Sequence, residues 1–128
     1  MADRKRGRII AAASSDGTAV DLHFGRAERF FIFEVPADGA APVFLGTKDV
    51  SRLCAGGHDA ERLRIIAETL SGCEYVFSAR IGEWAADALA EKGIRAMELP
   101  GSIAEAAERL RGYLELEDFF AGLTEENE

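Results

Sequence analysis

"EYVFSARIGEWAADALAEKGIRAMEL", residues 74–99, is the stretch that decides the fold class of this chain. Residues 74–79 are rich in side chains that favour strands, and residues 94–99 form a second short apolar run. Between them, residues 82–93 have the pattern of a helix that ends at Gly93. Strands joined by a helix run parallel, with a right-handed crossover. The stretch therefore predicts an α/β fold.

Upstream of this unit the sequence predicts three strands. Residues 7–14 form an apolar run that ends in a Ser/Asp/Gly turn, residues 28–35 are aromatic and β-branched, and residues 43–50 form the third strand. Asp38 and Gly39 form a turn between the second and third strands, which is typical of a hairpin. This half of the sheet should therefore be antiparallel.

The rest of the chain has the period of about 3.6 residues that is typical of helices. Apolar residues recur at this spacing between Asp59 and Gly72, and again after Ser102, which forms a capping box with Glu105. The element order is three strands, then helix, strand, helix, strand, helix. That order predicts a mixed five-stranded sheet of the ribonuclease H-like architecture, with helices on its faces.

The chain should fold as one domain with polar ends. Its 128 residues are 48% apolar, enough for one ordinary core. We expect a disordered basic arm at 1–7, a single domain at 8–120 and an acidic tail at 121–128. The formal net charge of −8 argues against binding to nucleic acid or to an anionic membrane. Because we find neither a signal-peptide pattern nor an apolar run of roughly 18 residues, we expect a cytoplasmic protein.

The sequence lacks the side chains that two common hydrolytic mechanisms need. Two-metal cleavage of nucleic acids needs converging carboxylates, but the first strand has no acid and the fourth ends at Arg80. Asp16 and Asp21 lie in a Ser/Gly turn, where aspartate is expected for turn chemistry. No nucleophile motif surrounds Cys54 and His58. We therefore do not expect an enzyme, and a degenerate nuclease or other hydrolase is kept only as an alternative.

The chain has two histidines, and both lie beside glycines outside the predicted helices and strands. His23 precedes a Phe-Gly pair, and three residues separate Cys54 from His58 in a glycine-containing loop. Thiolate and imidazole suit iron, zinc and iron–sulfur species, and loops after the carboxyl ends of strands share one rim of a sheet. We predict that these three residues form an open metal or cluster site. The alternative for His23 is a loop histidine that caps backbone groups. Cys73, at a helix-to-strand junction, is predicted to be a buried, inert thiol.

Positive side chains gather in or next to the same predicted loops, although the chain is acidic overall. They are Arg26, Arg29, Lys48, Arg52 and Arg80. An anion would suit them, and the backbone N–H groups of Gly56, Gly57 and the following helix would add to that preference. Alternatively they are ordinary surface residues paired with Glu28, Asp49 and Asp59, and spacing alone leaves both interpretations open.

Several segments together resemble a known family. "SSDG", "HFGRAERFFIFEV", "CAGGHD", "RIGEWAADALAEKGI" and "SIAEAAERL" are similar to the dinitrogenase iron–molybdenum cofactor biosynthesis family, which includes NifX-like carriers and the C-terminal domain of NifB proteins. The resemblance runs from about Arg8 to Leu114, and "HFGRA" is its most specific motif. It implies a non-catalytic protein that binds iron–molybdenum cofactor or its iron–sulfur precursor during nitrogenase cofactor assembly.

The resemblance also implies roles for particular residues. His23 is the candidate ligand, with Cys54 and His58 as partners, and Arg26 would neutralise the anionic cluster. Three glycines would leave room for a bulky guest: Gly25, Gly56 and Gly57. The radical-enzyme motif C-x-x-x-C-x-x-C is absent, so binding is expected rather than synthesis.

Two other functions stay open at this point. One is a regulatory or scaffold protein that binds a partner through the same loops without metal. The other is a metal-binding or cluster-binding protein of a different pathway. In each case we expect a monomer or a weak homodimer.

Overall fold

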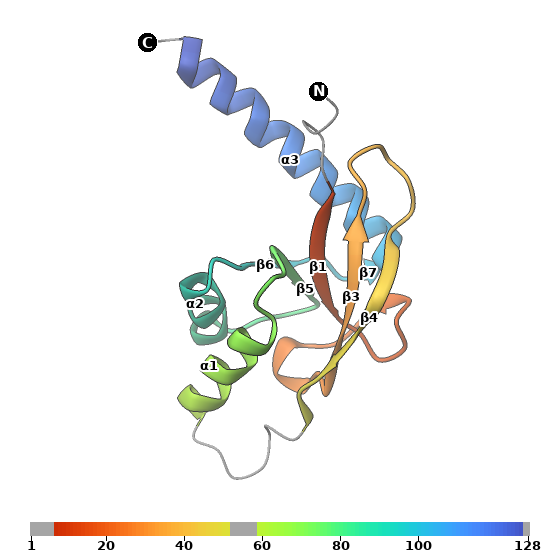
Figure 1. Cartoon of the computed structure of the whole chain (residues 1–128), viewed down its shortest axis with the longest axis vertical. Coiled ribbons are helices and arrows are strands. Elements are labelled where there is room, and N and C mark those ends of the chain that lie inside the picture. The colour runs from red at the N-terminus through yellow and green to blue at the C-terminus, as the bar shows by residue number, and fades with distance from the viewer. Residues whose placement is uncertain (1–6, 52–58, 127–128) are drawn as a thin grey trace.

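The computed structural model describes residues 7–51 and 59–126. Figure 1 shows its elements in chain order. The strands and helices are β1 (Arg8–Ala13), β2 (Ala19–Val20), the 3₁₀ turn η2 (Phe24–Arg26), β3 (Arg29–Val35), β4 (Val43–Asp49), α1 (Asp59–Thr69), β5 (Tyr75–Ser78), α2 (Glu83–Glu91), β6 (Arg95–Glu98), β7 (Gly101–Ser102) and α3 (Ile103–Glu126).

Five of the strands form one mixed sheet, as predicted. Its order is β4-β3-β1-β5-β6. β1 pairs antiparallel with β3, and β3 with β4, whereas β5 lies parallel to both β1 and β6. The strand-helix-strand stretch therefore forms the parallel half, and the early hairpin forms the antiparallel half.

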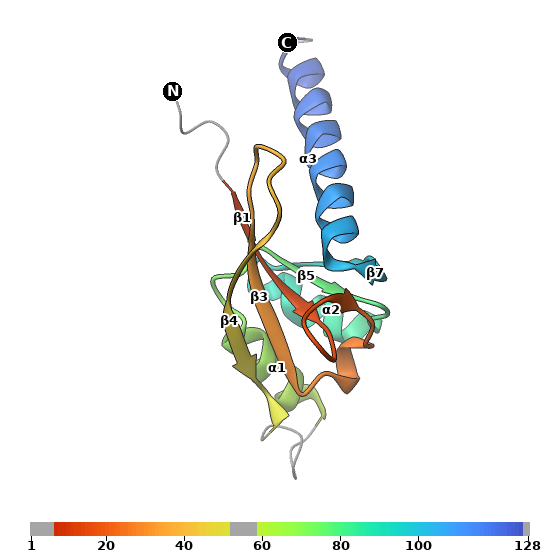
Figure 2. The same ribbon diagram turned by 90° about the vertical axis from the view of Figure 1, so that its right-hand side faces the viewer.

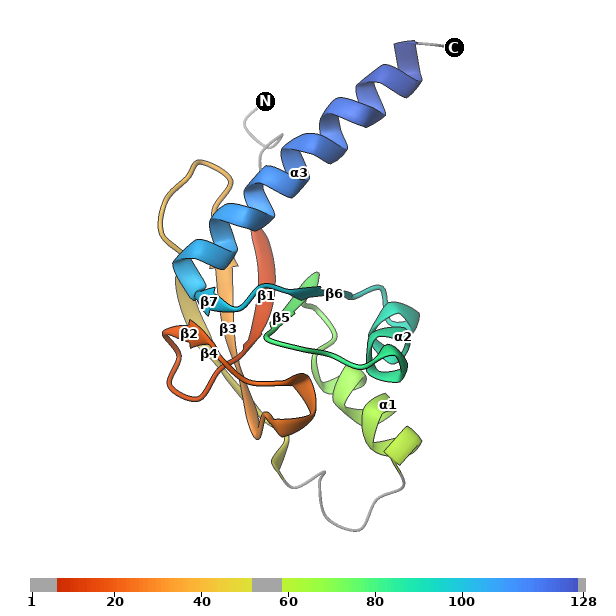
Figure 3. The same ribbon diagram turned by 180° about the vertical axis from the view of Figure 1, so that it is seen from behind.

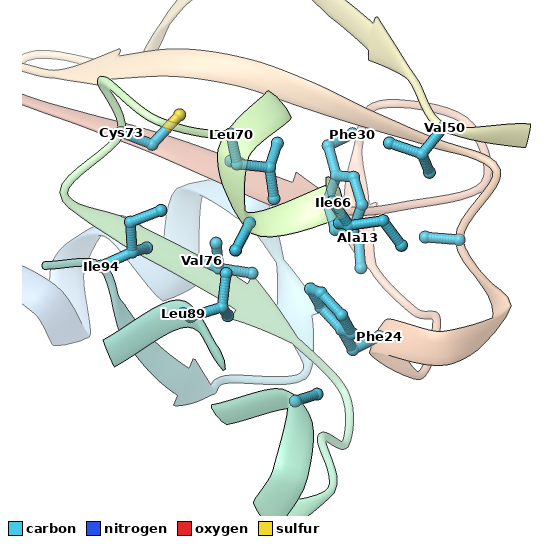
Figure 4. Close-up of a cluster of buried hydrophobic side chains, with 14 of the residues drawn as sticks. Ala13, Phe24, Phe30, Val50, Ile66, Leu70, Cys73, Val76, Leu89 and Ile94 are labelled. Carbon is cyan, nitrogen blue, oxygen red and sulfur yellow. The ribbon is translucent and has the colours of Figure 1, made fainter. Parts of the chain in front are cut away.

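The central strand β1 divides the core into two layers. Ala11 and Ala13 face a cluster that includes residues of α1 and α2, such as Ile66 and Leu89. Ile10 and Ala12 face the other cluster, which includes Leu110 and other residues of α3. Figure 4 shows the first cluster, and Figure 2 shows α3 apart from α1 and α2. Because β1 is covered on both faces, it is apolar along nearly its whole length.

The helix ends follow the predicted signals. Gly72 and Gly93 adopt the left-handed conformation just after α1 and α2, with φ of 98° and 77°. At the start of α3 the capping box is formed as predicted: the Glu105 N–H donates to Ser102 Oγ at 3.0 Å, and the Ser102 N–H donates to Glu105 Oε1 at 3.3 Å.

The last helix is longer than the sequence predicts. α3 continues to Glu126, so residues 121–126 of the expected acidic tail are helical. Its C-terminal half projects beyond the sheet (Figure 3). Residues 1–6 of the expected basic arm lie outside the described residues. Among the helices that the structure describes, none is long and apolar enough to cross a membrane.

Three elements were absent from the sequence prediction. β2 and β7 pair with each other as a two-stranded sheet, and η2 lies between β2 and β3. Each is only two or three residues long, too short to show a period of its own. β2 and β7 exist because each supplies the hydrogen bonds of the other from a distant part of the chain. The η2 turn closes on local hydrogen bonds and is tied to a distant segment by the Phe24 N–H, which donates to the Arg80 carbonyl oxygen.

Candidate functional site

The loop that carries His23 is held in place by its neighbour Phe24. The Phe24 side chain is buried, and its ring lies 5.4 Å from that of Phe30 in β3 (Figure 4). Its backbone N–H donates to the Arg80 carbonyl oxygen at 2.8 Å, and the Arg26 N–H donates to the His23 carbonyl oxygen at 2.9 Å. The HFGR segment is therefore a fixed turn, and it leaves His23, Gly25 and Arg26 at the surface.

A second loop, after the carboxyl end of β5, lies against the first. His23 and Arg80 form a parallel β-bridge, and the Ala79 N–H donates to the Leu22 carbonyl oxygen at 2.9 Å. The predicted partner of the His23 loop, the loop of Cys54 and His58, lies outside the described residues. The structure places the Arg80 loop beside His23. The crevice beyond the carboxyl ends of parallel strands is a usual position for ligand sites.

A cavity of about 560 Å³ opens between these two loops, α1 and the start of α2. Three lining residues are positively charged or can become so, and the others are apolar or glycine. The lining residues are His23, Phe24, Gly25, Arg26, Leu63, Arg80, Ile81, Gly82 and Ala85. Arg26 also lines two smaller hollows, of about 240 and 190 Å³. The main cavity has the volume and mixed lining that are usual for small-ligand sites, roughly 300–1,000 Å³.

The electrostatics of the cavity favour an anion. Neither Arg26 nor Arg80 forms an ion pair with another described residue. Gly82 is the N-cap of α2 and supplies no side-chain hydrogen bond, so the first N–H groups of that helix are left for a ligand or water. Acidic side chains also lie near this rim. Asp21 lines a smaller hollow together with His23 and Arg26, and the Glu98 carboxylate accepts the Ile81 N–H at 2.9 Å.

Two lining glycines keep the cavity open. Neither Gly25 nor Gly82 is among the glycines with positive φ, so the backbone does not require glycine at either position. A Cβ atom at either residue would meet no atom within 4 Å. The packing does not require glycine there either, and the missing side chains add to the free space.

The structure brings together only part of the predicted site. His23, Gly25 and Arg26 lie on one cavity, whereas Cys54, Gly56, Gly57 and His58 lie outside the described residues. The three-ligand set therefore stays a prediction. Within residues 7–51 and 59–126, no group of three His, Cys, Asp or Glu side chains is placed to hold a metal ion.

Two of the other predicted positive residues, Arg29 and Lys48, do not line the main cavity. Arg29 lies over the Phe31 ring, 5.7 Å from its centroid, and lines one of the smaller hollows beside Arg26. Lys48 lies in β4, opposite Phe30, and Arg52 lies outside the described residues. The interpretation as one cationic cluster is thus supported for Arg26 and Arg80.

Cys73 and the two turn aspartates have the structural roles that the sequence predicts. Cys73 is buried, and burial raises the pKa of its thiol above the usual value. The Thr18 N–H and hydroxyl both donate to Asp16, which lowers the pKa of that carboxyl group. Asp21 accepts hydrogen bonds from the Ser15 N–H and hydroxyl. Both carboxylates therefore stabilise the turn through hydrogen bonds.

Sequence reasoning noted the charge of Arg80 but missed the role of the residues after it. Ile81, Gly82 and Ala85 all line the cavity. The sequence feature that could have indicated this part of the cavity is Arg-Ile-Gly between a parallel strand and a helix. That junction places a positive side chain beside a helix N-terminus, where anions bind.

Comparisons with known proteins agree with the resemblance. The family model described as dinitrogenase iron-molybdenum cofactor matches residues 7–112. The FeMo cofactor biosynthesis protein NifB of Klebsiella pneumoniae is 35% identical over 92 residues, which are 67% of this chain and 19% of that protein. NifB of Sinorhizobium fredii is 37% identical over 94 residues, 72% of this chain and 18% of that protein. The chain thus spans about a fifth of the length of these relatives.

A solved structure shares the fold. The crystal structure of PH0822 superimposes with a TM-score of 0.58 at 18% sequence identity, covering 81% of this chain and 90% of that one. At this identity the likeness concerns the fold alone. The family match covers the loop of His23, the loop of Arg80 and all five strands of the sheet. The chain therefore belongs to the dinitrogenase iron–molybdenum cofactor family.

Proposed function

We propose that this chain is a carrier that binds iron–molybdenum cofactor, or its iron–sulfur precursor, as cargo during nitrogenase cofactor assembly. The observation that carries the proposal is the cavity in which His23 lies beside two arginines, Arg26 and Arg80, that have no ion pair among the described residues. Family membership adds to this, because relatives that match at 35–37% identity are named as FeMo cofactor biosynthesis proteins.

Each part of the cavity suits such a cargo. The His23 imidazole can coordinate iron or molybdenum, and the arginines offset the negative charge of a cluster. Leu63, Ile81 and Ala85 supply apolar walls that limit the access of water. Leu63 follows His58 by five residues along the chain, so we propose Cys54 and His58 as further ligands.

An incomplete ligand set is what a carrier needs. A cargo held by few protein ligands keeps open coordination positions, through which a recipient protein can bind and remove it. We propose that the chain acts without catalysis, in the cytoplasm, between assembly proteins that donate and receive the cluster. The strand order also supports the ribonuclease H-like architecture as the finer description of the fold.

The test is an anaerobic titration of the purified chain with the iron–sulfur precursor cluster, followed by optical and electron paramagnetic resonance spectra. We expect stoichiometric uptake by the wild type, and affinities about tenfold lower for Arg26→Gln and for Arg80→Gln, because a hydrogen bond to a charged group contributes about 1.5–3 kcal/mol. Arg109→Gln in α3 is the control, since it removes the same charge from an exposed position away from the cavity.

The outcomes separate the proposal from its alternatives. No uptake by a correctly folded wild type would contradict a carrier and favour a regulatory or scaffold protein. Uptake that Arg109→Gln weakens as much as Arg26→Gln would show that overall charge, and not the cavity, attracts the cluster.

A bulky side chain at Gly25 should block the cavity without harming the fold. Gly25 lines the cavity, and a Cβ there meets no atom within 4 Å. We expect Gly25→Leu to lower the affinity for the cluster at least about tenfold, with a change in unfolding free energy within about 0.5 kcal/mol. Gly112→Leu in α3 is the matched control, because a Cβ there is equally unobstructed. Unchanged cluster affinity of Gly25→Leu would count against this cavity as the binding site.

A further inference from the structure

The C-terminal half of α3 carries large apolar side chains that are exposed in the structure. Leu116, Phe119, Phe120 and Leu123 are 57%, 59%, 58% and 41% exposed. At about 100° per residue they fall within an arc of about 100° on one side of the helix. We call these four residues the α3 stripe. Figures 1, 2 and 3 show that this half of the helix projects beyond the sheet.

The α3 stripe is separate from the domain that the family shares. The family model ends at residue 112, four residues before Leu116. The projecting helix is nevertheless fixed at its base, because Arg95 donates to Tyr113 Oη at 2.6 Å and to Glu117 at 2.8 Å. A contiguous exposed apolar face on an anchored helix indicates an interaction surface.

We propose that a second copy of this chain covers the α3 stripe, in an antiparallel pair of α3 helices related by a twofold axis. The spacing of the stripe is the same from both ends: positions 116, 119, 120 and 123 are symmetric about the midpoint between Phe119 and Phe120. A twofold axis at that midpoint makes Leu116 face Leu123 of the second copy. The phenylalanines of both copies then meet at the centre, which is the self-complementary arrangement that a twofold dimer requires.

The charges on this part of α3 are compatible with a second copy. Residues 113–126 contain five acids and no Lys or Arg, so an arbitrary pairing of two such helices would bring like charges together. In the proposed register, Glu115, Glu117 and Asp118 each lie level with an uncharged residue of the second copy. Those residues are Thr124, Gly122 and Ala121, respectively.

The size of the α3 stripe predicts a reversible dimer. Each half-exposed side chain can bury about 100 Å², so two copies bury on the order of 1,000 Å² once flanking atoms are included. That area lies at the lower end for specific interfaces. We therefore expect monomer and dimer in equilibrium. The α3 stripe shares no residue with the cavity, so this proposal does not depend on cluster binding.

Sedimentation equilibrium of the full chain over a concentration series tests the dimer. We expect concentration-dependent dimerisation that Phe120→Glu weakens at least about tenfold, because a central apolar contact is lost and a charge is buried. Trp84→Glu is the matched control: Trp84 is 75% exposed on α2, away from α3, and the substitution adds the same charge. Circular dichroism should show that both variants keep their helices.

Disulfide cross-linking tests the register. In a Cys54→Ser background, an oxidised mixture of Leu116→Cys and Leu123→Cys chains should give a covalent heterodimer. Each variant alone should cross-link poorly. The two cysteines of such a dimer, one from each copy, would lie about 10 Å apart along the helix axis. Cys73 is buried and does not compete. A chain that stays monomeric at every concentration, with α3 intact, would overturn the proposal and leave the α3 stripe to a different protein. Equal cross-linking by either variant alone would also overturn it.

Discussion

Replacing His23 with alanine is expected to lower the affinity for the iron–sulfur precursor cluster by about 100-fold or more. His23 is the only histidine or cysteine among the described residues that line the cavity. Mutating a residue that only orients a metal ligand lowers metal affinity about 10–100-fold. Removing a ligand itself should lower the affinity at least as much. The measurement is the anaerobic titration, with the electron paramagnetic resonance spectrum of the bound cluster as a second readout.

The fold should not change in this variant. His23 is exposed, and its side chain makes no capping hydrogen bond to η2. Its contacts with Arg80 and Arg26 use the backbone, which alanine keeps. We therefore expect the free energy of unfolding to change by less than about 0.5 kcal/mol. His23→Cys should recover part of the affinity, because thiolate also binds iron. Wild-type affinity in His23→Ala would remove His23 from the site.

Replacing Phe24 with alanine is expected to damage both the fold and the site. Phe24 is 3% exposed, packs on Phe30, and is the neighbour of His23 in the chain. Removing a buried phenylalanine ring lowers the free energy of unfolding by about 3–5 kcal/mol. This is a large share of the unfolding free energy of a typical domain, which is about 5–15 kcal/mol. Urea denaturation measures this loss. The HFGR turn also loses its anchor, so cluster affinity should fall in the molecules that remain folded.

Leu110→Ala separates these two effects. Leu110 is fully buried, on the other face of the sheet, in the cluster that α3 covers. The substitution should lower the free energy of unfolding by about 2–5 kcal/mol. It should leave cluster affinity unchanged at temperatures where the variant is folded. If Leu110→Ala weakened the binding as much as Phe24→Ala, the effect of Phe24 would be one of general stability and not of the position of His23.

Strands and helices with a clear period could be predicted to within one or two residues at most ends. The predicted strand at 28–35 is found at Arg29–Val35, and the predicted helix at 82–93 is found at Glu83–Glu91. In both segments the local pattern and the final burial agree. The last helix is the exception, because an acidic composition at 121–126 suggests a tail but does not prevent a helix from continuing.

The candidate site could be predicted only in part. His23 and Arg26 stand out in the sequence because a histidine is rare in this chain and both lie in one short glycine-containing turn. The walls contributed by Leu63, Gly82 and Ala85 had no such local signal, since each is an ordinary residue of its own element.

The sequence by itself determined the α/β class, the order of the longer strands and helices, and the resemblance to the family. All of these depend on the period and composition of short segments, which are local properties. Only the tertiary structure decided that Arg80 joins His23, because residues 57 positions apart meet through the parallel pairing of β1 with β5. It also decided that α3 extends past the shared domain with an exposed apolar face. Whether an apolar residue is buried depends on which distant segment packs against it, and the period of a helix cannot specify that segment.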